Sequence, residues 1–330
     1  MILAGDIGGT KTNLALYEIN AETPKVKVQH QFVSREHQSL TDVIKAFELQ
    51  TSISQSEIKA ACFGIAGPVI NGRCRTTNLP WDITTQALQE YLGTQKIKLL
   101  NDLESTAYGM LYLKDEEFVQ INPSGRKTEG NRAVIAAGTG LGEALLYYDG
   151  TDYHPVGSEG GHTDLAPLRS QHDELLQWLR KRYHSHVSYE RILSGPGIYA
   201  LYEFLKESGF AAEPISMMHL PEETDKSAMV SKCALEEHDP LCVETLRLFA
   251  EFYGAEAGNL ALKTMSIGGL YIGGGIAPKI LPFLTDDRFV ESFVAKGRFE
   301  ELLRGIEVKV ALNQETSLLG AAHFAADKLL

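Results

Sequence analysis

The feature that most constrains this 330-residue chain is a strand–glycine turn–strand pattern that occurs twice. Residues 3–18 read LAGDIGGTKTNLALYE, where an apolar run reaches a carboxylate, breaks at glycines and resumes as alternating apolar residues. Residues 132–150, RAVIAAGTGLGEALLYYDG, follow the same design. We interpret the two copies as an internal repeat, one per half of the chain, and two unrelated glycine hairpins are the alternative.

A third apolar strand, within GGLYIGGGIAP at 268–278, also runs into glycines. Strand patterns elsewhere cover 27–33, 58–67, 97–101 and 307–312. Helical periodicity covers 40–49, 102–113, 171–183, 196–207, 227–237, 241–265 and 317–330, whereas 212–227 is the least periodic piece and predicts a surface loop. Strands that alternate with helices after an initial hairpin indicate an α/β protein.

Bulk properties limit the classes of function. A chain of 330 residues favours two domains, and the polar stretch at 122–131 is the best candidate linker. The net charge of −12 argues against binding to nucleic acid or to an anionic membrane, and no run has the roughly 18 apolar residues that a membrane span requires. Four cysteines without C-x-x-C spacing, and a strand that starts beside Met1, predict a cytoplasmic protein.

The glycine turns at 8–10, 138–140 and 273–275 each follow an apolar strand. Glycine lets the backbone approach a ligand closely, and consecutive N–H groups in such turns form nests that bind anions. Three such turns predict a polyphosphate ligand. Asp6 ends the first strand, where one carboxylate can serve a nucleotide-bound Mg²⁺ that keeps its waters. A turn-forming Asp that bonds its own backbone is the alternative.

Carboxylates, an amide and a histidine follow other predicted elements. Asp102 lies after the strand that ends at Asn101, where it is either a general base or an ordinary helix N-cap. Glu159 and His162 could read sugar hydroxyls, hold a metal or lie in an exposed loop. Glu190 lies near a predicted helix start, where a negative charge is favoured without any catalytic role.

Several blocks, taken together and in order, resemble the bacterial glucokinases of the hexokinase type. GDIGGT, GTGLG and GGGI look like the phosphate and adenosine motifs of the hexokinase–actin–Hsp70 superfamily. Five further blocks narrow the resemblance, which covers essentially the whole chain: GIAGPV (64–69), TNLPW (77–81), NDLESTAYG (101–109), GSEGGHTDLAP (157–167) and VSYERILSGPG (187–197). The resemblance implies an actin-like ATPase (ribonuclease H-like) fold with two α/β domains around a central cleft, 1–111 plus 315–330 and 112–314.

The resemblance also implies roles for individual residues. Asp102 would be the catalytic base on the glucose 6-hydroxyl, and the sugar contacts would be Asn78, Asn101, Asp102, Glu159, His162 and Glu190. The ATP-binding residues would be Gly5, Asp6, Ile7, Gly8, Gly9, Thr10, Gly138, Thr139, Gly140, Gly273, Gly274, Gly275 and Ser317. Asp6 would orient Mg²⁺ through water. Trp81 is expected in the core rather than against the sugar.

The expected reaction is transfer of the γ-phosphoryl group of ATP to the 6-hydroxyl of D-glucose, with sugar-driven domain closure. The resemblance to this family also implies a homodimer. Lys11 stands where many of these glucokinases have Asn, and GGTKT is common in the neighbouring ROK sugar kinases and repressors. Those relatives carry a Cys-rich zinc motif, whereas this chain has no cysteine between Cys74 and Cys233. A kinase of a related hexose, a sugar-responsive regulator, and an ATPase or phosphohydrolase without a sugar acceptor remain alternatives.

Overall fold

The computed structural model describes residues 1–19, 23–76, 79–123, 126 and 128–330. They form two compact units. The first unit holds Met1–Glu117, Ala144–Gly157 and Asn313–Leu330, and the second holds Phe118–Glu143 and Ser158–Leu312. The domain boundaries predicted from the sequence stay a prediction.

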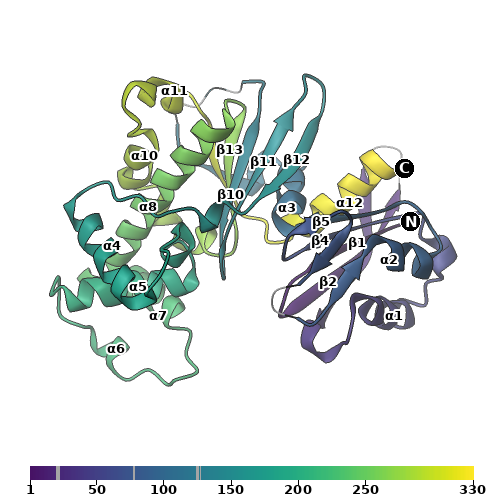
Figure 1. Cartoon of the computed structure of the whole chain (residues 1–330), viewed down its shortest axis with the longest axis horizontal. Helices are drawn as coiled ribbons and strands as arrows, with labels where there is room; N and C mark the ends of the chain where they lie inside the picture. The colour runs from purple at the N-terminus through teal and green to yellow at the C-terminus, as the bar shows by residue number, and fades with distance from the viewer. Residues whose placement is uncertain (20–22, 77–78, 124–125, 127) are drawn as a thin grey trace. The chain divides into compact units, whose positions relative to one another are not determined.

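The first 117 residues and the C-terminal helix build one sheet with helices on it (Figure 1). Its strands and helices are β1 (Ile2–Ile7), β2 (Lys11–Ile19), β3 (Pro24–Val33), α1 (Leu40–Thr51), β4 (Ala60–Ile65), α2 (Thr85–Leu92), β8 (Ile97–Asn101), α3 (Asp102–Met110) and α12 (Thr316–Leu329). The strand order is β3-β2-β1-β4-β8, with β1, β4 and β8 parallel. A small separate sheet contains β5 (Val69–Ile70), β6 (Arg73–Arg75) and β7 (Asp82–Thr84).

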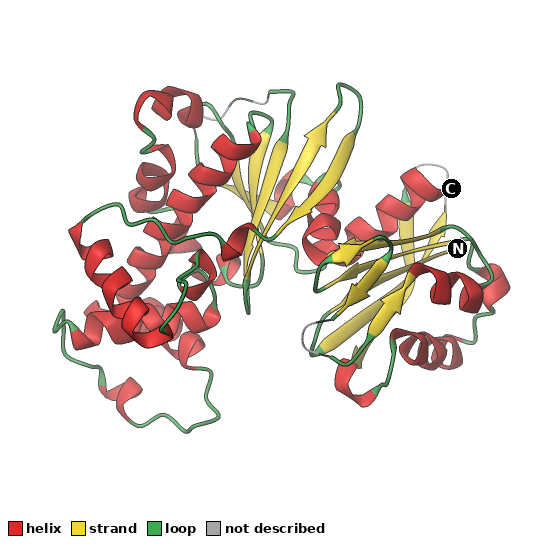
Figure 2. Cartoon of the chain, viewed as in Figure 1, coloured by secondary structure: helices red, strands yellow, loops and turns green. Residues whose placement is uncertain are grey.

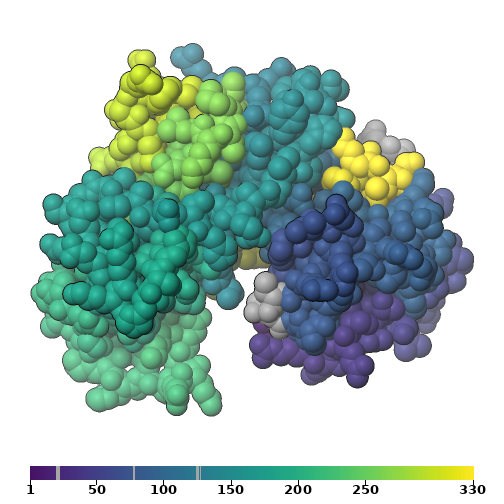
Figure 3. Space-filling view, in the orientation of Figure 1, coloured from purple at the N-terminus to yellow at the C-terminus, as the bar shows by residue number. Residues whose placement is uncertain are grey.

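The period-2 pattern of β1 sends its side chains to two different cores. Leu3 and Ile7 pack with residues of α1 and α2, whereas Ile2 and Ala4 pack with α12. Both faces of the sheet are therefore covered. Only the last turn of α12 is exposed, and its yellow spheres lie at the surface of the first unit in Figure 3.

The rest of the chain forms a second sheet with a larger helical layer (Figure 2). Its strands are β9 (Phe118–Gln120), β10 (Arg132–Ala137), β11 (Leu141–Tyr148), β12 (Tyr153–Ser158), β13 (Gly269–Gly273) and β14 (Val308–Ala311). Its helices are α4 (Ser170–Tyr183), α5 (Gly195–Glu207), α6 (Ile215–Met218), α7 (Lys226–Lys232), α8 (Pro240–Thr264), α9 (Leu281–Leu284), α10 (Asp287–Val294) and α11 (Glu300–Arg304).

The strand order of this sheet, β12-β11-β10-β13-β14, reproduces β3-β2-β1-β4-β8, with β9 added at the edge. The internal repeat predicted from the glycine turns is therefore confirmed at the level of topology. The first copy starts with antiparallel hairpins, and both copies continue with parallel strands, whose carboxyl ends share one edge of the sheet.

Several predicted elements differ from the structure at their ends. The helix predicted at 102–113 ends at Met110, and the stretch at 212–227, predicted as a loop, contains the single turn α6. The predicted helix at 227–237 changes from α7 into a π-helical turn at Cys233–Glu237. Trp81 is buried, as predicted, and its indole N–H donates to the His37 carbonyl.

Candidate active site

The three parallel strands of the first sheet end in register at Ile7, Ile65 and Asn101. The segments that follow them therefore lie along one edge of the sheet, where α/β proteins bind ligands. These segments are the turn at 8–10, the Gly67 loop and the start of α3, and they carry most of the first-unit residues predicted for the site. Asn78 lies outside the described residues.

Asn101, rather than Asp102, is the N-cap of α3. Asn101 Oδ1 accepts hydrogen bonds from the Leu103 and Glu104 backbone N–H groups at 2.7 and 3.4 Å. Glu104 returns the bond, because the Asn101 N–H donates to its Oε2 at 2.7 Å. This reciprocal arrangement is a capping box. Asn101 is therefore the N-cap, and the alternative that Asp102 is an ordinary N-cap is wrong.

Asp102 is the first helical residue and is partly buried. Its Oδ1 accepts from the Leu103 N–H at 2.9 Å. Asn101 Nδ2 donates to the Gly67 carbonyl at 3.3 Å, so the Gly67 loop is tied to the base of the helix. Glu104 Oε1 also accepts from the Gly157 N–H at 3.3 Å. The side chains of Asn101, Asp102 and Glu104 thus fix the backbone around the Asp102 carboxylate.

The turn at 8–10 is held by a serine that sequence reasoning missed. Ser34 Oγ donates to the Gly8 carbonyl at 2.8 Å, and the Ser34 N–H donates to the Thr10 carbonyl at 3.0 Å. Thr12 Oγ1 lies 3.0 Å from Ser34 Oγ. No local pattern marks Ser34 as a partner of this turn, because 24 or more residues separate it from Thr10 and Gly8.

Asp6 lies beside the same turn and is partly buried. Ser317 Oγ donates to its Oδ1 at 3.0 Å and Asn13 Nδ2 donates to its Oδ2 at 3.4 Å. Burial raises the pKa of the Asp6 carboxyl, and the two hydrogen bonds partly oppose that shift. Ser317 also carries the carbonyl that accepts from Ser105 Oγ of α3 at 2.8 Å. The C-terminal helix therefore brings Ser317 to Asp6 and braces the helix that carries Asp102.

Asp6 fits a nucleotide-bound Mg²⁺. A carboxylate has about four acceptor positions, and one hydrogen bond reaches each of its oxygens here, so both keep acceptor capacity. Mg²⁺ is commonly held by one or two carboxylates together with substrate phosphates and waters. In the described part of the chain, no group of three or more His, Cys, Asp and Glu side chains could hold a metal ion by itself.

In the second unit, two glycine turns share the carboxyl edge of the parallel strands β10 and β13, where Ala136 pairs with Gly273. Gly274 has a φ of +83°, and a Cβ there would lie 2.3 Å from the Ala137 carbonyl oxygen. Glycine at this position therefore lets the two turns touch. Of the glycines in the three turns, Gly274 is the one with positive φ, whereas a Cβ on Gly138 would meet no atom within 4 Å.

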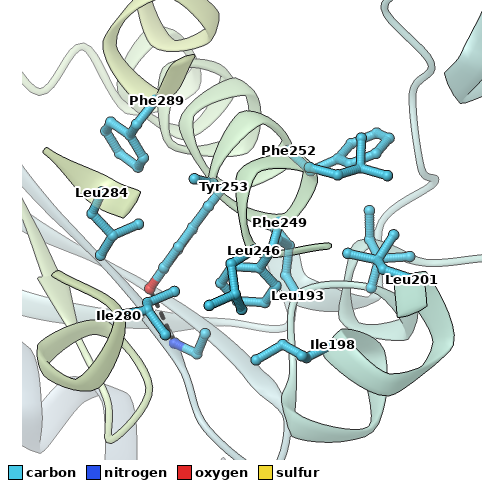
Figure 4. Packing of buried hydrophobic residues seen from close by; sticks show 14 of the residues in the cluster. Leu193, Ile198, Leu201, Leu246, Phe249, Phe252, Tyr253, Ile280, Leu284 and Phe289 are labelled. Atoms are coloured by element: carbon cyan, nitrogen blue, oxygen red, sulfur yellow. Dashed lines mark hydrogen bonds between the residues drawn. The ribbon is translucent and has the colours of Figure 1, made fainter. Parts of the chain in front are cut away.

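Two neighbours fix the 138–140 turn. The Tyr253 hydroxyl of α8 accepts from the Ala137 N–H at 3.1 Å, as Figure 4 shows among the packed side chains of α8. The Gly195 N–H, at the start of α5, donates to the Gly138 carbonyl at 2.8 Å. Helix N-termini favour anions, so the beginning of α5 adds to the electrostatic preference of this turn for phosphate.

Glu190 also lies at this turn. Its Oε2 accepts from the Leu141 N–H at 3.0 Å, and a Cβ on Gly140 would lie 2.5 Å from the same oxygen. Glycine at 140 therefore makes room for the carboxylate. The sequence predicts Glu190 near a helix start. No pattern of neighbouring residues predicts its contact with the 138–140 turn, about fifty residues earlier in the chain.

Glu159 and His162 are exposed on the loop after β12. This loop packs on the segment before α5, because the Leu165 N–H donates to the Val187 carbonyl at 3.0 Å and the Tyr189 N–H to the Thr163 carbonyl at 3.1 Å. The fold thus brings Glu159 and His162 onto a segment adjacent to Glu190. Glu159, His162 and Glu190 thus lie in the second unit, and Asn101 and Asp102 in the first.

The repeated sheet order, with glycine turns at the carboxyl ends of the parallel strands, defines a protein of the actin-like ATPase fold. A sequence model of the Glucokinase family matches residues 3–328. The chain belongs to the Glucokinase family.

Individual relatives agree with this assignment. A glucokinase of Nostoc is 39% identical over 339 residues, covering 99% of each chain. The crystal structure of a glucokinase from an Antarctic psychrotroph is 32% identical, covers 99% of both chains and superposes with a TM-score of 0.85. A ROK family glucokinase from Streptomyces griseus, crystallised with glucose and AMPPNP, has 18% identity and a TM-score of 0.67 over 98% of this chain and 99% of that one. This last similarity shows the fold alone.

No helix among the described residues is both long and apolar enough to cross a membrane.

Proposed function

We propose that the chain is a glucokinase that transfers the γ-phosphoryl group of ATP to the 6-hydroxyl of D-glucose, giving glucose 6-phosphate and ADP. The observation that carries this proposal is the match to the Glucokinase family from residue 3 to residue 328. Such a reaction needs a general base, and the partly buried Asp102 at the carboxyl end of β8 is the candidate for it.

In this mechanism Asp102 accepts the proton of the sugar hydroxyl as it attacks the γ-phosphorus. General-base catalysis of this kind contributes about 10²–10⁴ in rate. Asn101 hydrogen-bonds the sugar while its Oδ1 caps α3. This arrangement holds Asp102 in position next to the sugar hydroxyl. Glu159, His162 and Glu190 accept or donate hydrogen bonds to the other hydroxyls. Asn78 is proposed as a further sugar contact.

The phosphates are held by main-chain N–H groups of the turns at 8–10 and 138–140 and by the hydroxyls of Thr10 and Thr139. Fixed dipoles of this kind replace water around the charge that develops on the transferring group. Gly5 and Ile7 support the first turn, and the 273–275 turn and Ser317 contribute to nucleotide binding. Asp6 would hold Mg²⁺ through water, and the bound ion would supply positive charge that neutralises the phosphates.

We place the chain in the hexokinase-type bacterial branch of the family rather than in the zinc-containing ROK branch. The absence of cysteine between Cys74 and Cys233 supports this placement. The four cysteines are free and buried, which supports action in a reducing compartment, for which we propose the cytoplasm. We also propose a homodimer, which light scattering would report as twice the mass of one chain.

The test is ADP release by the parent and by Asp102→Asn with D-glucose, D-mannose, D-glucosamine, D-fructose or no sugar. We expect glucose-dependent release by the parent, a loss of about 10²–10⁴ in kcat for the variant, and glucose affinity largely kept. Glu116→Ala, which removes an exposed carboxylate after α3, is the matched control and should behave as the parent.

Other outcomes would point to other functions. Equal ADP release with and without sugar would indicate an ATPase, and sugar binding without ADP release would indicate a regulator. A preference for another hexose would keep the kinase and change its substrate. Normal turnover by Asp102→Asn would exclude Asp102 as the base.

A further inference from the structure

Two buried carboxyl groups lie beneath the loop that carries Glu159 and His162, and the proposed mechanism leaves both of them without a role. Glu143 on β11 is 2% exposed, and Glu256 in α8 is fully buried. The Glu256 side chain interacts with the Glu143 carboxyl and favours a proton on it. Glu143 Oε1 is buried and has no hydrogen-bond partner among the described residues.

Glu143 supports the loop directly. A Cβ on Gly160 would lie 2.0 Å from Glu143 Oε2, so the glycine backbone rests against the carboxyl group. Ser158 Oγ donates to the Glu143 carbonyl at 3.0 Å, and a Cβ on Gly161 would lie 2.1 Å from the Leu141 carbonyl oxygen. The segment from 158 to 162 therefore follows the position of Glu143 closely.

Glu256 connects to the other sugar segment. Asn259 Nδ2 donates both to Glu256 Oε2 at 2.8 Å and to the Tyr189 hydroxyl at 3.2 Å. Tyr189 precedes Glu190 in the chain. The carboxyl pair thus contacts the supports of both segments that carry Glu159, His162 and Glu190.

Few charges compensate the pair. Lys263 Nζ lies 3.3 Å from Glu256 Oε1 but is about half exposed. Lys296 Nζ donates to Asn259 Oδ1 at 2.7 Å, and burial lowers its pKa. The other titratable groups that face the pair are the hydroxyls of Tyr189 and Tyr253, whose pKa values are raised by burial and by these carboxylates, so both stay neutral.

Two buried carboxylates cannot both ionise at low cost, because desolvation and mutual repulsion disfavour the second charge. Burial, and then the charge of Glu256, raise the pKa of Glu143 to about 8. At neutral pH the Glu143 carboxyl therefore keeps its proton. Loss of this proton sets the charge of Glu143 against that of Glu256 beneath Gly160.

We propose that Glu143 and Glu256 are positioning residues that hold the 158–162 loop in the geometry that binds the sugar. This inference rests on the proposed function, because it assigns a sugar contact to that loop. Loss of the proton on Glu143 moves the loop and weakens sugar binding, while the phosphoryl-transfer step itself changes little.

The test compares the parent, Glu143→Gln and Glu143→Leu in glucose KM, kcat and calorimetric glucose affinity without nucleotide, from about pH 6 to pH 9.5. If sugar binds only while Glu143 is protonated, KM and the dissociation constant of the parent rise about tenfold one pH unit above the pKa of Glu143. Glu143→Gln keeps a donor towards Glu256 and cannot ionise, so its values stay flat. Glu143→Leu loses the donor and shows raised KM at every pH.

Glu244→Gln is the matched control, because it changes another buried carboxylate of α8, one that is paired with Arg288. It should follow the pH profile of the parent. A Glu143→Gln enzyme with the same alkaline rise in KM as the parent would overturn the positioning role, even if Glu143→Leu does not fold. Failure of the parent to bind or phosphorylate glucose at any pH would instead overturn the proposed function.

Discussion

Two glycines set the distance between the helix that carries Asp102 and the helix that carries Ser317. An ideal Cβ on Gly320 of α12 would lie 1.8 Å from the Ser105 carbonyl oxygen of α3, and one on Gly109 of α3 would lie 2.0 Å from the Thr316 carbonyl oxygen. Real Cβ atoms do not approach backbone oxygens closer than about 3.0 Å. Gly320→Ala therefore forces the helices apart by at least about 1.2 Å.

The cost of this change follows from three terms. Overpacking costs about 1–3 kcal/mol, and weakening of the hydrogen bond from Ser105 Oγ to the Ser317 carbonyl adds about 1 kcal/mol. Replacement of glycine by alanine inside a helix returns about 1 kcal/mol. We expect a net loss of about 1–3 kcal/mol in the free energy of unfolding of the first unit.

Activity should fall by more than this loss of stability suggests. The same displacement moves the start of α3 against the start of α12, and so changes where Asp102 stands relative to Asp6. A misplacement of about 1 Å can cost about 10²-fold in rate. We therefore expect kcat to fall by about one to two orders of magnitude at a temperature where the variant is still folded.

The assay combines urea unfolding followed by circular dichroism with ADP release at saturating glucose. Gly305→Ala is the control, because its Cβ would meet its nearest atom, the Leu302 carbonyl oxygen, at 3.3 Å. It should stay within about 0.5 kcal/mol of the parent and keep its kcat. A Gly320→Ala protein with the stability and turnover of the parent would refute the argument that this crossing positions the base.

Three further predictions concern single groups. Gly140→Ala places a Cβ 2.5 Å from Glu190 Oε2, so we expect the KM for ATP to rise about fivefold in the ADP assay, and an unchanged KM would separate this turn from nucleotide binding. Ser317→Ala removes a hydrogen bond that lowers the pKa of Asp6. The acidic limb of the plot of kcat against pH should therefore move to higher pH. An unmoved limb would contradict the role of Asp6 in that limb. Because the pKa of Glu143 is raised, the folded state binds more protons than the unfolded state between pH 4.5 and about 8. The free energy of unfolding therefore falls by up to about 1.4 kcal/mol per pH unit as the pH rises through that window. Glu143→Gln should flatten this pH dependence in urea midpoints, and an equal slope in the parent and the variant would argue against the raised pKa.

Much of the local structure was predictable because short-range signals carry it. The strand at 97–101 and the hairpin around the first glycine turn match the structure, since their apolar period and their turn glycines are local properties. The N-x-x-E spacing of Asn101 and Glu104 could also have revealed the capping box from the sequence. The N-cap was nevertheless weighed for Asp102, because both residue types are favoured there.

The partners of the candidate site were not predictable in the same way. Ser34 meets the 8–10 turn, Glu190 meets Gly140, and Ser317 meets Asp6 only after strands and helices from distant parts of the chain have packed. A hydrogen bond of about 3 Å depends on the position of two backbones, and no residue pattern within one segment encodes that position.

By itself, the sequence determined the α/β class, the repeated strand–glycine turn–strand units, and the residue types offered to a phosphate and to a sugar. Periodicity and glycine positions act over a few residues, and they suffice for these features. The tertiary structure alone decided the close crossing of α3 and α12 and the burial of Glu143 against Glu256. Those features arise from packing between segments more than a hundred residues apart, where excluded volume and desolvation act on neighbours in space rather than on neighbours in the chain.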